Sequence, residues 1–327
     1  MTTVVMGDEP VTRFEGRAMA SPLRLTLGLG GSGPAAEVAW QTVVASFEAS
    51  EQAMSRFRET SELTAFNRVA GRGVMGRPSG RLRRALSAAD RAVRVTGGRF
   101  DPRVLVDLDR LGYRGAPLPD AVDGPGGRRV VARCGRHELS LSRPVDLGGI
   151  GKGLALRWAA AELAASGWHD ILLEAGGDLV ARGFGPGGDP WLLGIEDPRG
   201  GEDLAVIAAA DLAVATSSVR VNRWTVDGRT VHHLIDPRTH EPADGGLLAV
   251  TVSSVDPAWA EIWSKVLFLE GRGVIAAEAR SRGLAAWWVG DDGALEMTPA
   301  ARMMTVWTAA EDQGSISRVG GSAIRAR

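Results

Sequence analysis

A glycine-dense segment that ends in a lysine is the stretch of this sequence with the clearest chemical use. Residues 145–153 read V-D-L-G-G-I-G-K-G, and the pattern places the glycines between a strand and a helix. Glycines in such a turn let backbone N–H groups approach a ligand closely, and a helix N-terminus favours an anion. Lys152 would add a positive charge for a phosphate. The alternative is a tight turn with a solvated lysine.

This segment is not a Walker A loop. Asp146 stands where that loop has its first glycine, and Gly153 stands where the loop has the Ser or Thr that binds Mg²⁺. The pattern therefore predicts an anion site of another kind.

A histidine and an aspartate lie close together where a predicted strand ends. The sequence His233-Leu-Ile-Asp236-Pro places His233 and Ile235 on one face of the strand and His232 on the other. A histidine beside a carboxylate is suited to act as a general base. The alternative is a hydrogen-bonded structural histidine. The spacing of His232, His233 and His240 is not that of zinc ligands, so we expect no zinc site.

Two other patterns carry less weight. Gly28-x-Gly30-x-x-Gly33 matches the dinucleotide-binding fingerprint, but the strand before it alternates apolar and polar residues, whereas a first Rossmann strand is buried on both faces. Cys134, the only cysteine, excludes an internal disulfide and is expected to be an ordinary residue at a strand end.

Many short strands and a few helices must position these residues. The periodicity and the capping residues predict one α+β domain with a mixed, largely antiparallel sheet flanked by helices. We expect residues 1–12 to be an N-terminal extension, 13–310 the domain and 311–327 a polar tail. Helices are expected over 35–57, 62–68, 82–96, 154–166, 257–269 and 274–283. Strands are expected over 12–28, 129–133, 138–141, 145–147, 191–195, 204–209, 213–216, 223–226, 231–235, 247–253, 285–290 and 303–308, and two more within 170–184, on either side of a turn at Gly176-Gly177.

The composition is that of an ordinary globular protein. Of 327 residues, 44% are hydrophobic and 24% are charged, and the net charge of −1 gives no reason to expect a nucleic-acid partner. The sequence contains no uninterrupted run of ~18 apolar residues, which is the length that spans a membrane. The first twenty residues lack a signal-peptide pattern, so we expect a cytoplasmic protein. Lys152 and Lys265 are the only lysines.

Taken together, the motifs resemble those of one family. Their types and their order are similar to those of ApbE-type FAD:protein FMN transferases over about residues 15–308, nearly the whole chain. The motifs that carry the resemblance are Met54-Ser-Arg-Phe, Ser61-Glu62-Leu63 with Asn67, Thr96-Gly-Gly-Arg-Phe-Asp101-Pro, the 145–153 segment, Ala175-Gly-Gly-Asp178, Ala215-Thr-Ser217, His233-Leu-Ile-Asp236-Pro-Arg-Thr, and Leu247 through Leu269.

The resemblance implies an enzyme that binds FAD and, with Mg²⁺, cleaves its diphosphate. FMN would be attached through a phosphoester to a Thr or Ser hydroxyl of an acceptor flavoprotein. It implies that Lys152 and His233 are catalytic. It also implies flavin-, adenine- and diphosphate-binding roles for Met19, Ser61, Glu62, Leu63, Asp101, Lys152, Gly153, His233 and Ile235. Two alternatives stay open: an FAD-binding protein without transfer activity, and a pyrophosphatase that yields FMN and AMP.

The resemblance also implies a metal held by the backbone carbonyl of Gly151 and by side chains at positions 261 and 265. The family has Asp and Thr at the last two positions, whereas this chain has Glu261 and Lys265, and an ammonium cannot ligate a metal. Two hypotheses follow. Glu261 and Lys265 form a plain salt bridge one helical turn apart, or the Lys265 ammonium replaces part of the metal's charge.

Overall fold

The computed structural model describes residues 2–5, 11–28, 31–118 and 129–310. Its centre is an eight-stranded sheet in which every neighbouring pair is antiparallel, as the sequence largely predicts. In spatial order its strands are β17 (Leu295–Met297), β16 (Ala285–Gly290), β15 (Leu247–Ser254), β10 (Leu212–Ser218), β7 (Asp178–Arg182), β6 (Ile171–Ala175), β3 (Ser21–Leu27) and β2 (Thr12–Ala18).

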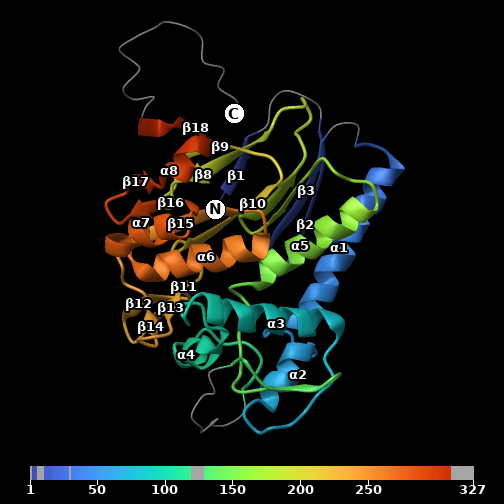
Figure 1. The fold of residues 1–327 in the computed structure, drawn as a ribbon, viewed down its shortest axis with the longest axis vertical. Coiled ribbons are helices and arrows are strands. Elements are labelled where there is room, and N and C mark those ends of the chain that lie inside the picture. Colours follow the sequence, from blue (N-terminus) through green and yellow to red (C-terminus); the bar gives the residue numbers. More distant parts are fainter. Residues whose placement is uncertain (1, 6–10, 29–30, 119–128, 311–327) are drawn as a thin grey trace, which may run out of the picture.

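Helices cover one face of this sheet (Figure 1). Leu23, Leu25 and Leu27 of β3 point toward them, because alternate residues of a strand face the same side. Their partners in this core come from α1 and α5, and α6 packs on β10 and β15. The helices of this layer are α1 (Pro34–Met54), α5 (Gly151–Ala165), α6 (Pro257–Glu270) and α7 (Arg272–Ser281).

A smaller four-stranded sheet packs on the opposite face. Leu172 of β6 lies in this second core, while its neighbours Ile171 and Leu173 lie in the helix-side core. The small sheet consists of β1 (Thr2–Val5), β8 (Trp191–Glu196), β9 (Asp203–Ala209) and β18 (Thr305–Thr308), with α8 (Pro299–Met304) before β18. Part of the predicted N-terminal extension thus forms a strand paired with β8. The predicted tail, 311–327, lies outside the described residues.

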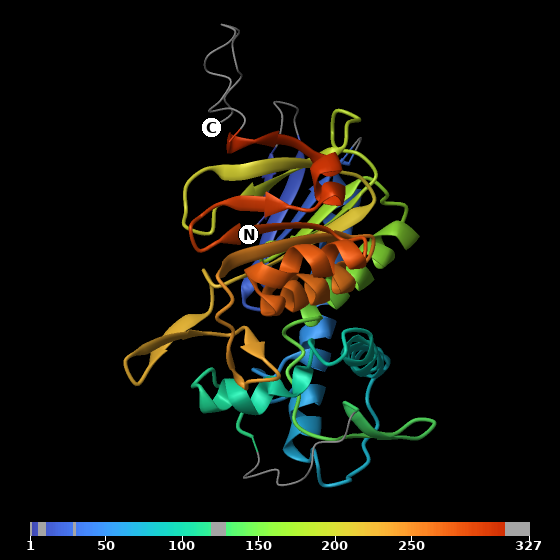
Figure 2. The same cartoon turned by 60° about the vertical axis from the view of Figure 1, so that its left-hand side comes forward.

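The remaining elements form a separate layer below the sheets, and one hairpin, β11–β12, projects from the body (Figure 2). These elements are α2 (Glu62–Arg68), α3 (Gly80–Val95), the 3-10 turn η1 (Pro102–Val104), α4 (Leu105–Arg110), β4 (Val131–Cys134), β5 (Leu139–Leu141), β11 (Arg223–Val226), β12 (Arg229–His232), β13 (Ile235–Asp236) and β14 (Glu241–Pro242). Cys134 is exposed at the end of β4, as expected. Among the described helices none has the length and apolar character needed to cross a membrane.

The segment 145–147 is not a strand, so that part of the prediction is wrong. Its backbone is held instead by one side chain: Asn67 donates from Nδ2 to the carbonyl of Val145 at 2.9 Å and accepts from the Val145 N–H at 2.9 Å. The buried side-chain amide of Asn67 therefore makes the two backbone hydrogen bonds that a neighbouring strand would otherwise make. The alternation predicted for 231–235 also fails, because β12 ends at His232 and β13 begins at Ile235.

We expect Asn67→Leu to lower the free energy of unfolding by about 2 kcal/mol, because it leaves a buried N–H and a buried C=O of Val145 without partners. Urea denaturation measures this change. Gln52→Leu is the matched control, since Gln52 also donates one amide bond to a backbone carbonyl, but from an exposed position. The interpretation fails if the two variants lose the same small amount of stability.

Candidate functional site

A two-lobed cavity lies where the helix layer meets the lower elements. The first lobe encloses about 350 Å³ and the second about 330 Å³, and they share lining residues that include Tyr113, Asp146 and Lys152. Together the lobes fall in the size range of small-molecule and cofactor sites. The walls come from the N-terminus of α5, from α6, from the end of β10 and from the 99–102 turn.

The glycine turn forms one wall, but most of its amides have partners within the chain. Gly148 donates to Asp146 Oδ1 at 2.7 Å, and Gly151 donates to the carbonyl of Leu147 at 2.7 Å. Gly153 donates to Glu261 Oε2 at 2.8 Å. A ligand in this cavity therefore contacts the side chains of the glycine turn more than the backbone N–H groups of that turn.

Gly153 has a second role, which is to let two helices touch. A Cβ at this position would lie 2.5 Å from the carbonyl oxygen of Pro257 and 2.6 Å from the Cα of Ala258. Because only glycine fits, α5 approaches the start of α6 closely enough for the Gly153 amide to reach Glu261. Gly153 does not line the cavity, whereas Gly151 lines the second lobe.

Lys152 is bound to two buried carboxylates. Its ammonium forms an ion pair with Asp178, at the start of β7, and lies 3.7 Å from Glu261 Oε1. Burial alone would lower the pKa of Lys152, but Asp178 and Glu261 raise it above its ordinary value. Burial raises the pKa of Glu261 to about 7, and Asp178 adds to that rise while Lys152 opposes it. We refer to Lys152, Asp178 and Glu261 as the charged triad.

Lys265 lies on α6 one turn after Glu261 and lines the first lobe. The predicted Glu261–Lys265 salt bridge is wrong, because Glu261 uses its oxygens on Gly153 and Lys152 instead. Within the described part of the chain, Lys265 has no ion-pair partner within 4.0 Å. Burial lowers its pKa, and Glu261 and Asp146 oppose that shift.

His233 lines the first lobe and is partly buried in its wall. Burial lowers its pKa to about 3, and the positive charges of Lys265 and Lys152 add to the shift. The ring is therefore neutral at physiological pH. Its Nδ1 is buried and has no hydrogen-bond partner among the described residues. A neutral imidazole with a spare nitrogen can accept a proton from a ligand in this lobe.

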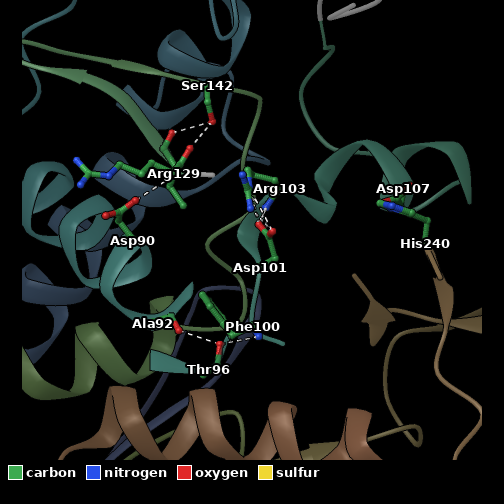
Figure 3. Close-up of polar contacts among 11 residues, drawn as sticks. Asp90, Ala92, Thr96, Phe100, Asp101, Arg103, Asp107, Arg129, Ser142 and His240 are labelled. Atoms are coloured by element: carbon green, nitrogen blue, oxygen red, sulfur yellow. Dashed lines mark hydrogen bonds and ion pairs between the residues drawn. The ribbon is translucent and has the colours of Figure 1, made fainter. Parts of the chain in front are cut away.

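The turn after α3 holds two more lining residues in place (Figure 3). Thr96 donates to the carbonyl of Ala92 at 2.8 Å and accepts from the amide of Phe100 at 3.0 Å. Asp101 caps η1 by accepting from the amide of Arg103 at 2.9 Å, and its carboxylate also pairs with the Arg103 guanidinium. Phe100 and Asp101 are thereby fixed at the wall of the first lobe.

The remaining predicted site residues are divided between the cavity and the core. Met19 lines the second lobe and Ile235 the first. Ser61 is instead the N-cap of α2, Glu62 accepts from the amide of Ser79 at 2.7 Å, and Leu63 is fully buried in the main core. None of these last three lines either lobe.

Sequence reasoning missed an aromatic wall and the role of an aspartate. Tyr113 lines both lobes and stacks on Trp224 with 5.0 Å between ring centroids, and Phe57 meets it edge to face at 5.7 Å. The one available signal was that Tyr113 is the only tyrosine of the chain. Asp178 follows the Gly-Gly turn of one of the motifs named above, but nothing in the sequence indicates that it meets Lys152.

Comparison with solved structures gives the class of the fold. The chain matches the apo flavinyl transferase ApbE of Pseudomonas stutzeri with a TM-score of 0.77 and 26% identity, covering 90% of this chain and 96% of that one. It shares the fold of the ApbE protein from Thermotoga maritima with a TM-score of 0.79 and 23% identity, covering 90% and 99%. The fold is therefore that of the flavinyl transferases.

Sequence comparison gives the family. The model of the ApbE family matches residues 19–288. The chain is 28% identical over 313 residues to the FAD:protein FMN transferase of Klebsiella pneumoniae strain 342, covering 89% of this chain and 88% of that one. It is 30% identical over 269 residues to that of Treponema pallidum strain Nichols, covering 73% of each. The chain belongs to the ApbE family of FAD:protein FMN transferases.

Proposed function

We propose that this protein binds FAD in the two-lobed cavity and transfers FMN to a Thr or Ser hydroxyl of an acceptor protein. The observation that carries the proposal is the neutral His233, with its unpartnered buried Nδ1, in the same lobe as two lysines. A hydroxyl nucleophile needs a base, and a diphosphate needs positive charge. The family membership and the names of the relatives support the same activity.

The transfer step balances with these residues alone. The acceptor oxygen bonds to the phosphorus on the FMN side of the diphosphate, and the bond from that phosphorus to the bridging oxygen breaks. AMP leaves with the bridging oxygen and its electron pair, and the hydroxyl proton passes to Nδ1 of His233. Positive charge on the lysines stabilises the negative charge that builds on the phosphoryl oxygens. The aromatic wall of Tyr113 and Phe57 offers a surface for a flat ring system.

The residues present do not fit a Mg²⁺ ion. Mg²⁺ takes oxygen ligands in octahedral geometry, but three of the four carboxylate oxygens of Asp178 and Glu261 are bonded to Lys152 or to backbone amides, and the fourth lies 3.7 Å from the Lys152 ammonium. Position 265 presents an ammonium rather than an oxygen. In the described part of the chain, no three His, Cys, Asp or Glu side chains are grouped to hold a metal.

The test is incubation of the purified protein with FAD and a threonine-bearing acceptor domain, followed by mass spectrometry of the acceptor. We expect one FMN to be added to the acceptor and AMP to be released in equal amount. Release of FMN and AMP with no acceptor modified would favour a pyrophosphatase. Stable FAD binding without AMP release would favour a binding protein, and absence of FAD binding would refute the assignment.

A further inference from the structure

The positively charged side chains that line the cavity differ in how they are paired. In the second lobe, Arg56 pairs with Asp146 and Arg58 pairs with Glu48 and Glu51. In the first lobe, Arg99 pairs with Asp236 and Glu270. Lys152, which lines both lobes, belongs to the charged triad. Among the cavity-lining cations of the described chain, Lys265 alone has no carboxylate within 4.0 Å.

The site is shaped around the Lys265 side chain. A Cβ at Gly149 would lie 3.0 Å from Lys265 Cε and closer still to its ammonium, and 3.1 Å from Phe100 Cε2. The glycine at this position of the turn therefore leaves the space that the lysine head occupies. Phe100, whose amide donates to Thr96, borders the same space. The end of the Lys265 side chain therefore lies against Gly149 of the glycine turn, without an ion pair to fix it there.

The charges decide which lysine is available to a ligand. Above pH 7, where both carboxylates are ionised, the charged triad carries a net charge of −1, so the charge of Lys152 is already opposed by two carboxylates. Lys265 adds +1 and brings the four groups to neutrality. Of the lining ammonium and guanidinium groups of the described chain, only Lys265 is not already engaged in an ion pair, so it is the one that a diphosphate in this lobe can bind without displacing a carboxylate. A charge without an ion-pair partner in a partly buried lobe acts on a ligand more strongly than one exposed to water.

We propose that the Lys265 ammonium takes the place of a divalent cation in this site, so that the diphosphate of FAD is bound without Mg²⁺. The inference rests on the proposed function, since it assumes that FAD is the ligand. It makes Lys265 a residue that binds the diphosphate directly, and it explains why the oxygens that would ligate a metal are committed to Lys152 and to backbone amides.

The first test measures FAD affinity by quenching of flavin fluorescence, in excess EDTA and in millimolar Mg²⁺. For the wild type we expect the two dissociation constants to agree within a factor of about two. Lys265→Thr should weaken FAD binding in EDTA by about tenfold or more, the loss expected for a charge-assisted contact. Lys265→Arg should retain most of the affinity. Arg133→Thr, which removes one exposed charge from the β4–β5 hairpin, is the matched control.

The second test measures metal binding directly, with Mn²⁺ as the spectroscopic probe. We expect no saturable Mn²⁺ site in the wild type with FAD present. In Glu261→Asp combined with Lys265→Thr, a carboxylate and a hydroxyl face the diphosphate, and we expect Mn²⁺ to bind and FAD affinity to become metal-dependent. FAD binding by the wild type that requires Mg²⁺, or a stoichiometric Mn²⁺ site in the wild type, would overturn the inference and leave the proposed function intact. Failure of the wild type to bind FAD both in EDTA and in Mg²⁺ would overturn the inference and the proposed function together.

Gly149→Ala tests the same idea without removing the lysine. The added methyl group must displace the flexible end of Lys265, so we expect FAD affinity in EDTA to fall several-fold while the fold is retained. In the Lys265→Thr background the same substitution should have little further effect, because the group it displaces is gone. Equal losses in both backgrounds would mean that Gly149 acts on FAD through the backbone, and this would refute the role of Lys265.

Discussion

Replacement of His233 by Asn is expected to lower the rate of FMN transfer by about 10²–10⁴-fold, the usual contribution of a general base. FAD affinity should change little, because the role inferred for Nδ1 is to receive a proton from the acceptor hydroxyl rather than to hold the dinucleotide. Single-turnover transfer rates and FAD titrations separate the two effects. An unchanged transfer rate would mean that His233 is a structural residue.

His232 provides a matched control for this substitution. Its Nε2 lies 3.0 Å from the carbonyl oxygen of Ala243, and its Nδ1 accepts from the amide of Leu234 at 3.2 Å, so both ring nitrogens have partners away from the cavity. His232→Asn should transfer FMN within about threefold of the wild-type rate at temperatures where it is folded, as expected of a residue that takes no part in the proton transfer. A loss as large as that of His233→Asn would show that the effect comes from disturbing the 232–236 segment.

The pH dependence of the reaction gives an independent reading of His233. The pKa of an ordinary histidine near 6.5 would produce an acid limb in kcat/KM just below neutrality. Burial and the nearby lysines lower the pKa of His233 to about 3, so the free enzyme keeps this base unprotonated well below pH 6. We therefore expect the kcat/KM profile of the wild type to show no acid limb near pH 6.5. A limb at that pH that is present in the wild type and lost in His233→Asn would contradict this expectation.

The sequence correctly predicts those helices and strands that are determined by residues within or next to them. Ser61 caps α2 through the Thr64 amide at 3.1 Å, and α2 begins at Glu62 as predicted. The alternation in β3 correctly places its leucines on the core side. The segment around Val145 fails because its apolar alternation looks like a strand, while its backbone partner is the side chain of Asn67, far away in the sequence. No local pattern contains that information.

The site shows the same division. The lysine and the histidine were found because their residue types and local context suggested chemistry, and the structure brings Lys152 and His233 to the same lobe. Their partners depend on tertiary contacts. Glu261 turns away from Lys265, to which helical spacing assigns it, because the approach of α5 to α6 at Gly153 offers a buried amide and a second ammonium. Helical spacing identifies neighbours, but burial decides which of them pair.

Lys152→Met is expected to lower the free energy of unfolding by about 3–4 kcal/mol near pH 8, because it leaves Asp178 and Glu261 buried without their cation. Urea denaturation measures the loss. It should be smaller at pH 5, where Glu261 can take up a proton. If Lys152→Met weakens FAD binding but leaves stability unchanged at both pH values, Lys152 serves the diphosphate rather than the two carboxylates.

The sign of this pH dependence follows from Glu261. Its pKa is raised to about 7 in the folded protein, above the value of 4.5 for an unperturbed glutamate, so between these values the folded state holds more protons than the unfolded state. The contribution of Glu261 to the free energy of unfolding is therefore at its maximum below pH 4.5 and is lost as the pH rises through 7. Without Lys152 the pKa rises further and the loss extends to higher pH. Glu261→Gln in the Lys152→Met background removes the charge and keeps an acceptor for the Gly153 amide. It should restore stability at pH 8 and change it little at pH 5, and restoration of equal size at both pH values would exclude Glu261 as the titrating group.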